Sequence, residues 1–160
     1  MSAEYSNILE GSCHCENVGI ELHTNRKENE FTPRTCQCSL CKKHDASWIS
    51  DPEGVAKLNF KDRDQVSFYR FGHSTSDFIV CKKCGVLTIA ICEVDGRNRA
   101  VLNIKSMSGT TFTADPITTN FDGETVESRL ERRAKNWTGH VVFSDQNDLN
   151  HEAHESHEDV

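Results

Sequence analysis

The chain has 160 residues, of which 36% are hydrophobic, and a net charge of −7 at neutral pH. This length fits one domain with an appendage and a modest core, and no apolar run approaches the roughly 20 residues that a membrane-spanning helix needs. Residues 144–160 contain six carboxylates and no Lys or Arg, which is −6 of the total −7 and leaves −1 on residues 1–143. A near-neutral body lacks the broad basic surface that nucleic-acid binding uses, so we expect neither a membrane nor a nucleic-acid partner.

Short alternating or continuous apolar stretches predict β-strands along most of the chain. In the clearest case, Val18, Ile20 and Leu22 alternate with Gly19 and Glu21, as in a half-buried strand. The segment 31–35 contains Pro33 and is expected at an edge or as an irregular strand. The expected strands cover residues 18–22, 31–35, 46–50, 55–60, 66–71, 78–80, 86–92, 99–104 and 140–143.

One helix is predicted near the C-terminus, because a single apolar stripe at helical spacing passes through Val126, Leu130, Ala134 and Trp137. Thr125 or Asp122 can cap its start, and Gly139 stands where a helix end favours glycine. The following acidic segment has few apolar residues, so we expect a domain at 1–143 and a disordered tail at 144–160. The tail histidines at 151, 154 and 157 are only a weak metal-binding signal.

Seven of the eight cysteines fall into three tight clusters. The clusters are Cys13-His-Cys15, Cys36-Gln-Cys38-Ser-Leu-Cys41 and Cys81-Lys-Lys-Cys84. The eighth, Cys92, lies in a continuous apolar run and is expected to be a buried hydrophobic residue outside the clusters. Such tight spacing is typical of metal ligation, in which a structural zinc takes four thiolates and a catalytic zinc takes three protein ligands.

Seven ligands divide into one closed site and one open site. Cys13, Cys15, Cys81 and Cys84 would bind a structural Zn²⁺ that joins the N-terminal strand to a later hairpin. The other three, Cys36, Cys38 and Cys41, would bind a second, catalytic Zn²⁺ with one vacant coordination position. Each chain would then hold two zinc ions.

Two alternatives remain open at this point. Disulfides are disfavoured, because closely spaced pairs rarely bridge internally and the first residues show no secretory signal; we expect reduced thiols and a cytoplasmic location. Alternatively, His44 would complete a Cys₃His structural site, and both metals would then serve only stability.

The order and spacing of the cysteines resemble the family of glutathione-dependent formaldehyde-activating enzymes and centromere protein V. The resemblance rests on Gly11-Ser-Cys-His-Cys15, Cys36-Gln-Cys-Ser-Leu-Cys41 and Cys81-Lys-Lys-Cys-Gly85. It implies a mainly β fold, the β-tent of small antiparallel sheets with two zinc sites, here with one C-terminal helix. It also implies the same four structural and three catalytic zinc ligands, and carbon–sulfur lyase chemistry on glutathione adducts.

The expected partner is a small thiol or a glutathione adduct, and a homodimer is allowed. A coordinated thiol is deprotonated, so the open site suits sulfur chemistry such as the reversible addition of a thiol to an aldehyde. Arg34 and the lysines at 42, 43, 82 and 83 would attract carboxylates, and His44 and His73 are candidate acids or bases. The alternatives are a non-catalytic zinc-stabilised binding module and, by analogy with the centromere protein, a chromatin-associated protein.

Overall fold

The computed structural model describes residues 4–121, 123–143 and 155–156. The described strands form two sheets, with strand orders β1-β2-β5-β11 and β10-β3-β4-β9-β8-β7-β6-β12. The first sheet consists of β1 (Asn7–Ser12), β2 (Val18–Thr24), β5 (Val55–Phe60) and β11 (His140–Phe143). The second consists of β3 (Arg34–Cys36), β4 (Trp48–Ile49), β6 (Val66–Arg70), β7 (Asp77–Cys81), β8 (Leu87–Val94), β9 (Arg97–Asn103), β10 (Ile117–Thr119) and β12 (Glu155–Ser156).

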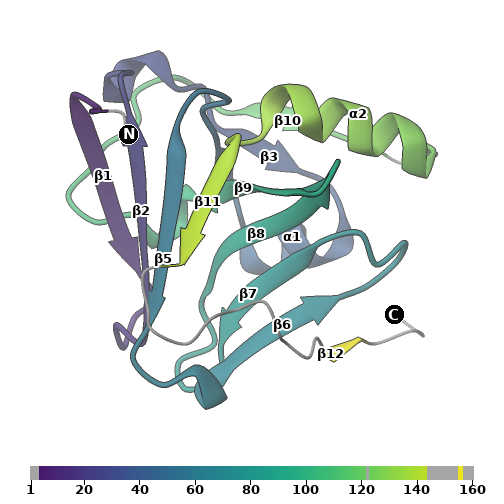
Figure 1. Cartoon of the computed structure of the whole chain (residues 1–160), viewed down its shortest axis with the longest axis horizontal. Coiled ribbons are helices and arrows are strands. Elements are labelled where there is room, and N and C mark those ends of the chain that lie inside the picture. Colours follow the sequence, from purple (N-terminus) through teal and green to yellow (C-terminus); the bar gives the residue numbers. More distant parts are fainter. Residues whose placement is uncertain (1–3, 122, 144–154, 157–160) are drawn as a thin grey trace.

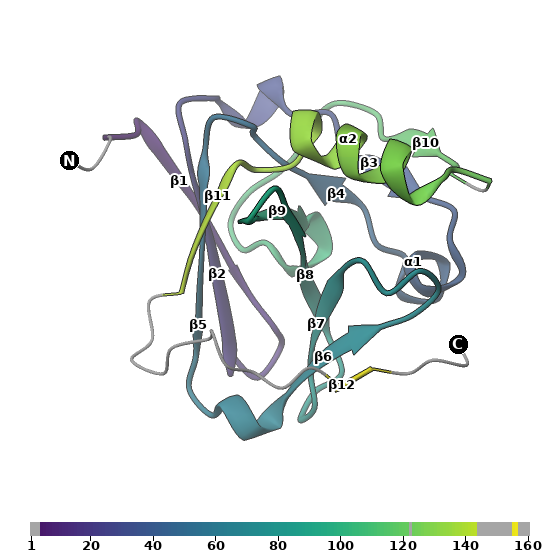
Figure 2. The same cartoon turned by 45° about the vertical axis from the view of Figure 1, so that its right-hand side comes forward.

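Two α-helices accompany the sheets within the described ranges. The short α1 (Ser39–His44) lies beside the second sheet, and the longer α2 (Val126–Asn136) passes above β3, β4 and β10 (Figures 1 and 2). Three 3₁₀ turns complete the elements: η1 (Glu28–Glu30), η2 (Arg63–Gln65) and η3 (Ile104–Ser106). The predicted mainly β fold with a C-terminal helix is therefore confirmed.

The sheets are mixed, whereas the resemblance implied antiparallel ones. Strands β10, β11 and β12 pair in parallel with β3, β5 and β6, and the other pairs are antiparallel. Each of these three strands follows its partner after a long stretch of chain, which is long enough for the crossover that parallel pairing needs.

Strands β8 and β9 separate two hydrophobic cores. Ile89 of β8 and Leu102 of β9 belong to the first core, which also contains the inward side chains of the four-stranded sheet. Ala90 and Val101, one position along each strand, belong to the second core, together with Trp137 at the end of α2. Because successive side chains point to opposite faces, a strand that is buried on both faces shows the continuous apolar run found at 87–92.

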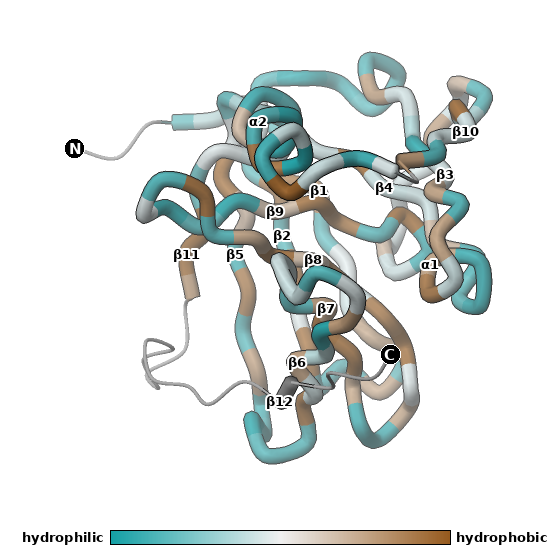
Figure 3. The backbone as a smooth tube through the Cα atoms, turned by 90° about the vertical axis from the view of Figure 1, so that its right-hand side faces the viewer, coloured by the Kyte–Doolittle hydropathy of each residue, from teal (hydrophilic) through white to brown (hydrophobic). Residues whose placement is uncertain are grey.

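Hydrophobic residues concentrate along the strands, and hydrophilic residues dominate α2 and the loops (Figure 3). The helix begins as predicted, with the Thr125 hydroxyl accepting a bond from the Ser128 amide at 3.0 Å. Its end differs, because Trp137 rather than a glycine is the C-cap residue. Gly139 instead permits a close approach, since an added Cβ would lie 2.5 Å from the carbonyl oxygen of Pro52.

Other expected elements shift by a few residues, and three were missed. The strand expected at 31–35 begins at Arg34 and lies inside the sheet between β4 and β10, not at its edge. Strands β1 and β10 and helix α1 were not predicted. Each is short, and β1 and β10 lack a strictly alternating apolar pattern.

The tail prediction falls mostly on residues outside the described part, including the three tail histidines. Within it, Glu155 and Ser156 pair with Tyr69 and Arg70, and the disorder expected of the tail stays a prediction. The division at residue 143 stays a prediction. In the described ranges, no helix combines the length and apolar character that a membrane crossing requires.

Candidate metal centres and adjoining cavity

The structure brings the outer two cysteine clusters together into one group of four sulfurs. Cys13 and Cys15 follow β1, whereas Cys81 ends β7 and Cys84 lies in the turn before β8. All four ligand atoms lie within 4.8 Å of one another, with 3.8 Å between Cys13 and Cys15 and 3.5 Å between Cys15 and Cys81. A tetrahedron with zinc–sulfur bonds of about 2.3 Å has edges of about 3.8 Å.

Two tight turns hold these sulfurs in place. The amide of Val18 donates to Cys13 Sγ at 3.2 Å, and the amide of Gly85 closes the second turn onto the carbonyl of Cys81 at 2.8 Å. Gly85 has a φ of 81°, as the predicted turn requires. Burial raises the pKa of Cys13 to about 12, although the Val18 amide lowers it, so a bound cation is needed to keep this thiol ionised.

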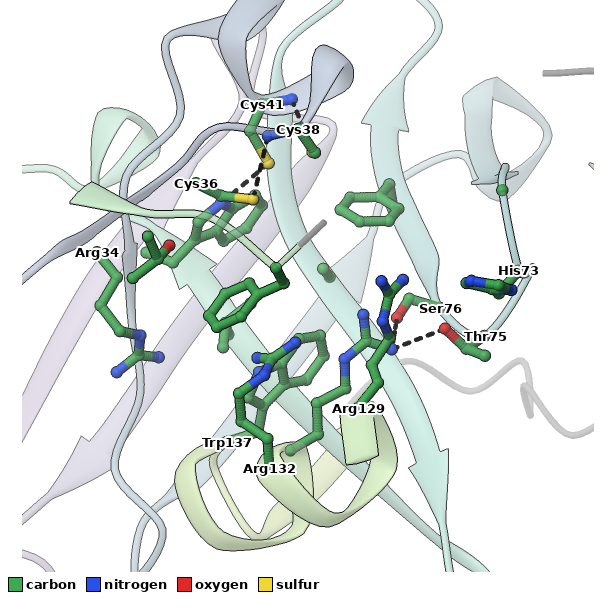
Figure 4. A pocket seen from close by; sticks show the side chains of 18 of the residues that line it. Arg34, Cys36, Cys38, Cys41, His73, Thr75, Ser76, Arg129, Arg132 and Trp137 are labelled. Carbon is green, nitrogen blue, oxygen red and sulfur yellow. Dashed lines mark hydrogen bonds between the residues drawn. The ribbon is translucent and has the colours of Figure 1, made fainter. Parts of the chain in front are cut away.

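The middle cluster forms a separate group of three sulfurs around the start of α1. Cys36 ends β3, Cys38 is the N-cap of α1, and Cys41 lies within the helix. Their ligand atoms lie within 4.8 Å of one another, and Figure 4 shows the three residues gathered at one side of the pocket. The division of seven cysteines into four and three is therefore present in the structure.

Each sulfur of the middle cluster receives one N–H donor at 3.4 Å. The Cys38 amide donates to Cys36, the Cys41 amide donates to Cys38, and the indole N–H of Trp48 donates to Cys41. Hydrogen bonds from the neighbouring thiols lower the pKa of Cys38, whereas bonding among the three sulfurs raises the pKa of Cys41. Three thiolates held this close together would repel one another unless a cation lay between them, and the donor set fits zinc or another thiophilic metal.

No fourth ligand joins the middle cluster among the described residues. A histidine nitrogen or an aspartate or glutamate oxygen could serve as the fourth ligand, but in the described residues none of these atoms lies in the group that the three sulfurs form. His44 is outside the group, so the Cys₃His alternative is wrong for the described part of the chain. Cys92 belongs to neither group and is 1% exposed, as predicted for a buried hydrophobic residue.

A cavity of about 330 Å³ opens beside the middle cluster, and all three of its cysteines line it. The cavity lies between α1, the sheet and α2 (Figure 4). The outer four cysteines do not line this cavity. The two groups therefore differ: the first offers four sulfurs to a metal ion, whereas the second offers three and lines a cavity. That the first is structural and the second catalytic stays a prediction.

Aromatic rings form one wall of the cavity. Trp48 packs edge-on against Phe78 with 6.3 Å between ring centroids, and Phe71 packs against Phe78 at 5.3 Å. Both Trp48 and Trp137 are largely buried. This wall excludes water from one side of the sulfur group and strengthens electrostatic interactions there.

Four arginines line the remaining part of the cavity, and sequence reasoning identified only Arg34. Arg129, Arg132 and Arg133 come from α2, and the sequence analysis assigned them no role. A buried arginine in the helix stripe leaves no hydrophobicity signal, so only the packing of α2 over the cysteines shows their role.

The lysines expected to attract carboxylates do not line the cavity. Lys42 and Lys43 are exposed on α1, and Lys82 and Lys83 are exposed beside the four-sulfur group. His73 lines the cavity from the loop between β6 and β7, whereas His44 does not. The positive charge at the open site thus comes from guanidinium groups rather than from lysines.

Comparison with known proteins decides the family. The family model for the glutathione-dependent formaldehyde-activating enzyme (GFA) matches residues 8–122. The chain belongs to the GFA family. The match covers both cysteine groups and Arg34, but α2 and its three arginines lie beyond its end.

A crystal structure of a Rhodobacter sphaeroides protein, a structural genomics target, has the same fold as this GFA member. The two chains are 22% identical, with a TM-score of 0.53, and the match covers 69% of this chain and 99% of the other. None of the curated proteins compared with the chain gave a significant match.

Proposed function

We propose that this GFA protein is a zinc-dependent carbon–sulfur lyase that makes or breaks the adduct between a thiol and an aldehyde. The supporting observation is that three cysteine sulfurs, without a fourth ligand among the described residues, line a cavity large enough for a small adduct. Zinc held by Cys36, Cys38 and Cys41 would accept the substrate sulfur as a thiolate at its remaining position.

In the forward direction the thiol sulfur adds to the aldehyde carbon. The C–S bond forms, the π electrons of the C=O bond pass to oxygen, and that oxygen takes up the proton that the thiol lost. In the reverse direction the hydroxyl loses its proton and the C–S electron pair returns to sulfur. No oxidant or reductant is needed, because thiol plus aldehyde and the S-hydroxyalkyl adduct are isomeric in composition.

The protein side chains have three tasks in this reaction. The aromatic wall of Trp48 and Phe78 keeps water away from the adduct. Water would otherwise compete with the thiol for the carbonyl carbon. The N–H donors on the three sulfurs orient them and limit their basicity. His73, the one histidine among the described lining residues, is our candidate for moving the proton on the carbonyl oxygen.

Cobalt substitution tests the proposal. The cobalt-loaded chain should show a thiolate charge-transfer band that shifts when glutathione is added, and Cys38→Ser should abolish that shift. Formaldehyde and glutathione should then yield S-hydroxymethylglutathione faster with protein than without it. If the charge-transfer band stays unchanged at millimolar glutathione, the three-cysteine group does not accept an external thiol, and the proposal is wrong.

The alternative is a zinc-stabilised binding module without turnover. The outer four-sulfur group favours it, because that group joins segments far apart in sequence and needs no reaction to explain it. A thiol-dependent spectral shift without any acceleration of adduct formation would favour this alternative.

A further inference from the structure

The charge lining the cavity is strongly one-sided. Arg34, Arg129, Arg132 and Arg133 line it, and the described lining residues contain no aspartate or glutamate. One carboxylate nearby, Glu124, binds the Arg129 and Arg132 side chains at 2.9 to 3.3 Å. Within the described structure, Arg34 and Arg133 have no carboxylate partner.

Arg133 is a buried cation surrounded by neutral groups. It is 7% exposed, and its Nη1 atom donates to the hydroxyls of Thr75 and Ser76 at 2.8 and 2.7 Å and to Cys92 Sγ at 3.4 Å. Its Nε atom is buried without a hydrogen-bond partner. A buried charge that lacks an opposite charge is costly, so this guanidinium is poised for an anion.

The other arginines line the same cavity. Arg34 donates to the Ser50 hydroxyl at 2.7 Å, and its pKa is lowered by burial and by the charges of Arg132 and Arg26. Burial likewise lowers the pKa of Arg133, with further contributions from Arg132 and Arg129. Like charges held this close repel one another, and a bound anion would relieve the repulsion.

Resting on the proposed function, we propose that the cavity favours a carboxylate over an ammonium group on the thiol that it binds. The sulfur would bind at the three-cysteine group and the carboxylate at Arg34 and Arg133, whose planar donors suit a carboxylate. An ammonium group would enter a cavity that offers it cations and no acid among the described lining residues. Of these two arginines, Arg34 lies within the residues that the family model matches, whereas Arg133 lies on α2, beyond them.

The test compares small thiols of nearly equal shape. 3-Mercaptopropionate carries the carboxylate, 3-mercaptopropionamide is its neutral isostere, and cysteamine carries an ammonium group. The dissociation constant of each is measured from the cobalt charge-transfer band of the cobalt-loaded protein. We expect the carboxylate to bind at least about tenfold tighter than the amide, and cysteamine to bind weakest.

This order runs against thiol acidity. A neighbouring cation lowers a thiol pKa, so cysteamine would bind best if thiolate formation alone governed affinity. Raising the salt concentration should weaken the binding of 3-mercaptopropionate and leave the binding of 3-mercaptopropionamide unchanged, because only the first carries a carboxylate that is attracted to the arginines. N-acetylation of glutathione should likewise tighten its binding.

Two variants and one control assign the effect to the arginines. Arg34→Gln and Arg133→Gln should each reduce the carboxylate-to-amide preference at least threefold while leaving amide binding in place. Lys43→Gln, which removes the same charge from the exposed face of α1, should leave the preference unchanged. The unmodified chain supplies the comparison of the three thiols even if Arg133→Gln fails to fold.

The outcomes separate the two proposals. If no thiol alters the spectrum, the open site and the proposed function fail together. If all three thiols bind with equal affinity, or cysteamine binds best, the proposed function stands and the selectivity for carboxylates is overturned. A preference that survives both arginine substitutions would also overturn the assignment to these residues.

Discussion

The indole N–H of Trp48 donates to Sγ of Cys41 across 3.4 Å, which links the aromatic wall of the cavity directly to the metal-binding sulfurs. Trp48 is the first residue of β4, only seven residues after Cys41, so the turn after α1 brings the ring back over the helix. Cys36 and Cys38 take their hydrogen bonds from backbone amides, which substitution cannot remove. Among the described residues, Trp48 is therefore the side chain whose substitution removes a hydrogen-bond donor from these sulfurs.

Trp48→Phe should weaken metal binding at the three-cysteine group and leave the four-cysteine group unaffected. Without the indole donor Cys41 becomes more basic, so protons compete better and the charge-transfer band of bound cobalt moves to lower energy. Loss of such a supporting contact reduces metal affinity by roughly 10- to 100-fold. Competition with a chelator measures this, with Trp137→Phe as the control for loss of an indole at the same cavity. Equal effects of both substitutions would show that packing, not the N–H donor, is responsible.

The two metal centres should differ in their contribution to stability. The outer group joins Cys15 to Cys81 across 66 positions, whereas the middle group spans only residues 36–41. Closing a loop reduces the entropy of the unfolded chain, and the reduction grows with the length of the loop. A cross-link across the outer group therefore stabilises the fold by about 4 kcal/mol, and one across the middle group by about 2 kcal/mol.

Cys84→Ser should therefore lower the free energy of unfolding by roughly 2 kcal/mol more than Cys38→Ser. Urea unfolding of the zinc-loaded variants measures the difference, with Cys92→Ser as a control outside both groups. Equal losses for Cys84→Ser and Cys38→Ser would support the non-catalytic binding module.

Acid should loosen the start of α2 through Glu124. Hydrogen bonds from Arg132, together with the charges of Arg132 and Arg129, lower the pKa of Glu124 below its ordinary value near 4.5. A carboxyl with a lowered folded-state pKa stabilises the fold above its unfolded-state pKa, and that contribution disappears as the pH falls through the folded-state pKa. The free energy of unfolding is therefore measured for the native chain and for the Glu124→Gln variant as a function of pH. The native value minus the variant value should be constant above about pH 5.5 and should decrease below about pH 4.5. A difference that does not change with pH would exclude this ion pair as the cause.

The limits of sequence reasoning follow from where each signal lies. Cysteine spacing predicts both cysteine groups because ligands of one site recur at short intervals, and the largely apolar run at 87–92 predicts a strand. The arginines of the cavity have no such signal, because Arg133 resembles any surface residue of an amphipathic helix until α2 is packed over the cysteines. The parallel pairing of β10, β11 and β12 was missed for a related reason: pairing over long separations depends on tertiary contacts and not on local pattern.

The loop between β6 and β7 depends on an ion pair at its base. Arg70, the last residue of β6, binds the Asp77 carboxylate at 2.8 and 3.2 Å and also donates to the Ser74 carbonyl at 3.1 Å. The loop contains two residues with positive φ, Gly72 and Ser74, so its conformation needs such support. Its residues 71–73 line the cavity, and the adjoining Thr75 binds Arg133.

Asp77→Asn should release this loop while leaving both metal groups intact. Loss of the charged hydrogen bonds lowers the free energy of unfolding by about 1 to 3 kcal/mol. It should also accelerate proteolytic cleavage within residues 71–76 and weaken thiol binding severalfold, since Arg133 loses its fixed hydroxyl partners. Zinc content should stay at the native value because the Asp77 carboxylate binds Arg70, which belongs to neither cysteine group. Asp95→Asn, the same change in an exposed turn, is the matched control. If the Asp77→Asn variant is cleaved at the same rate as this control and binds thiol with the same affinity, the ion pair does not hold the loop against the cavity.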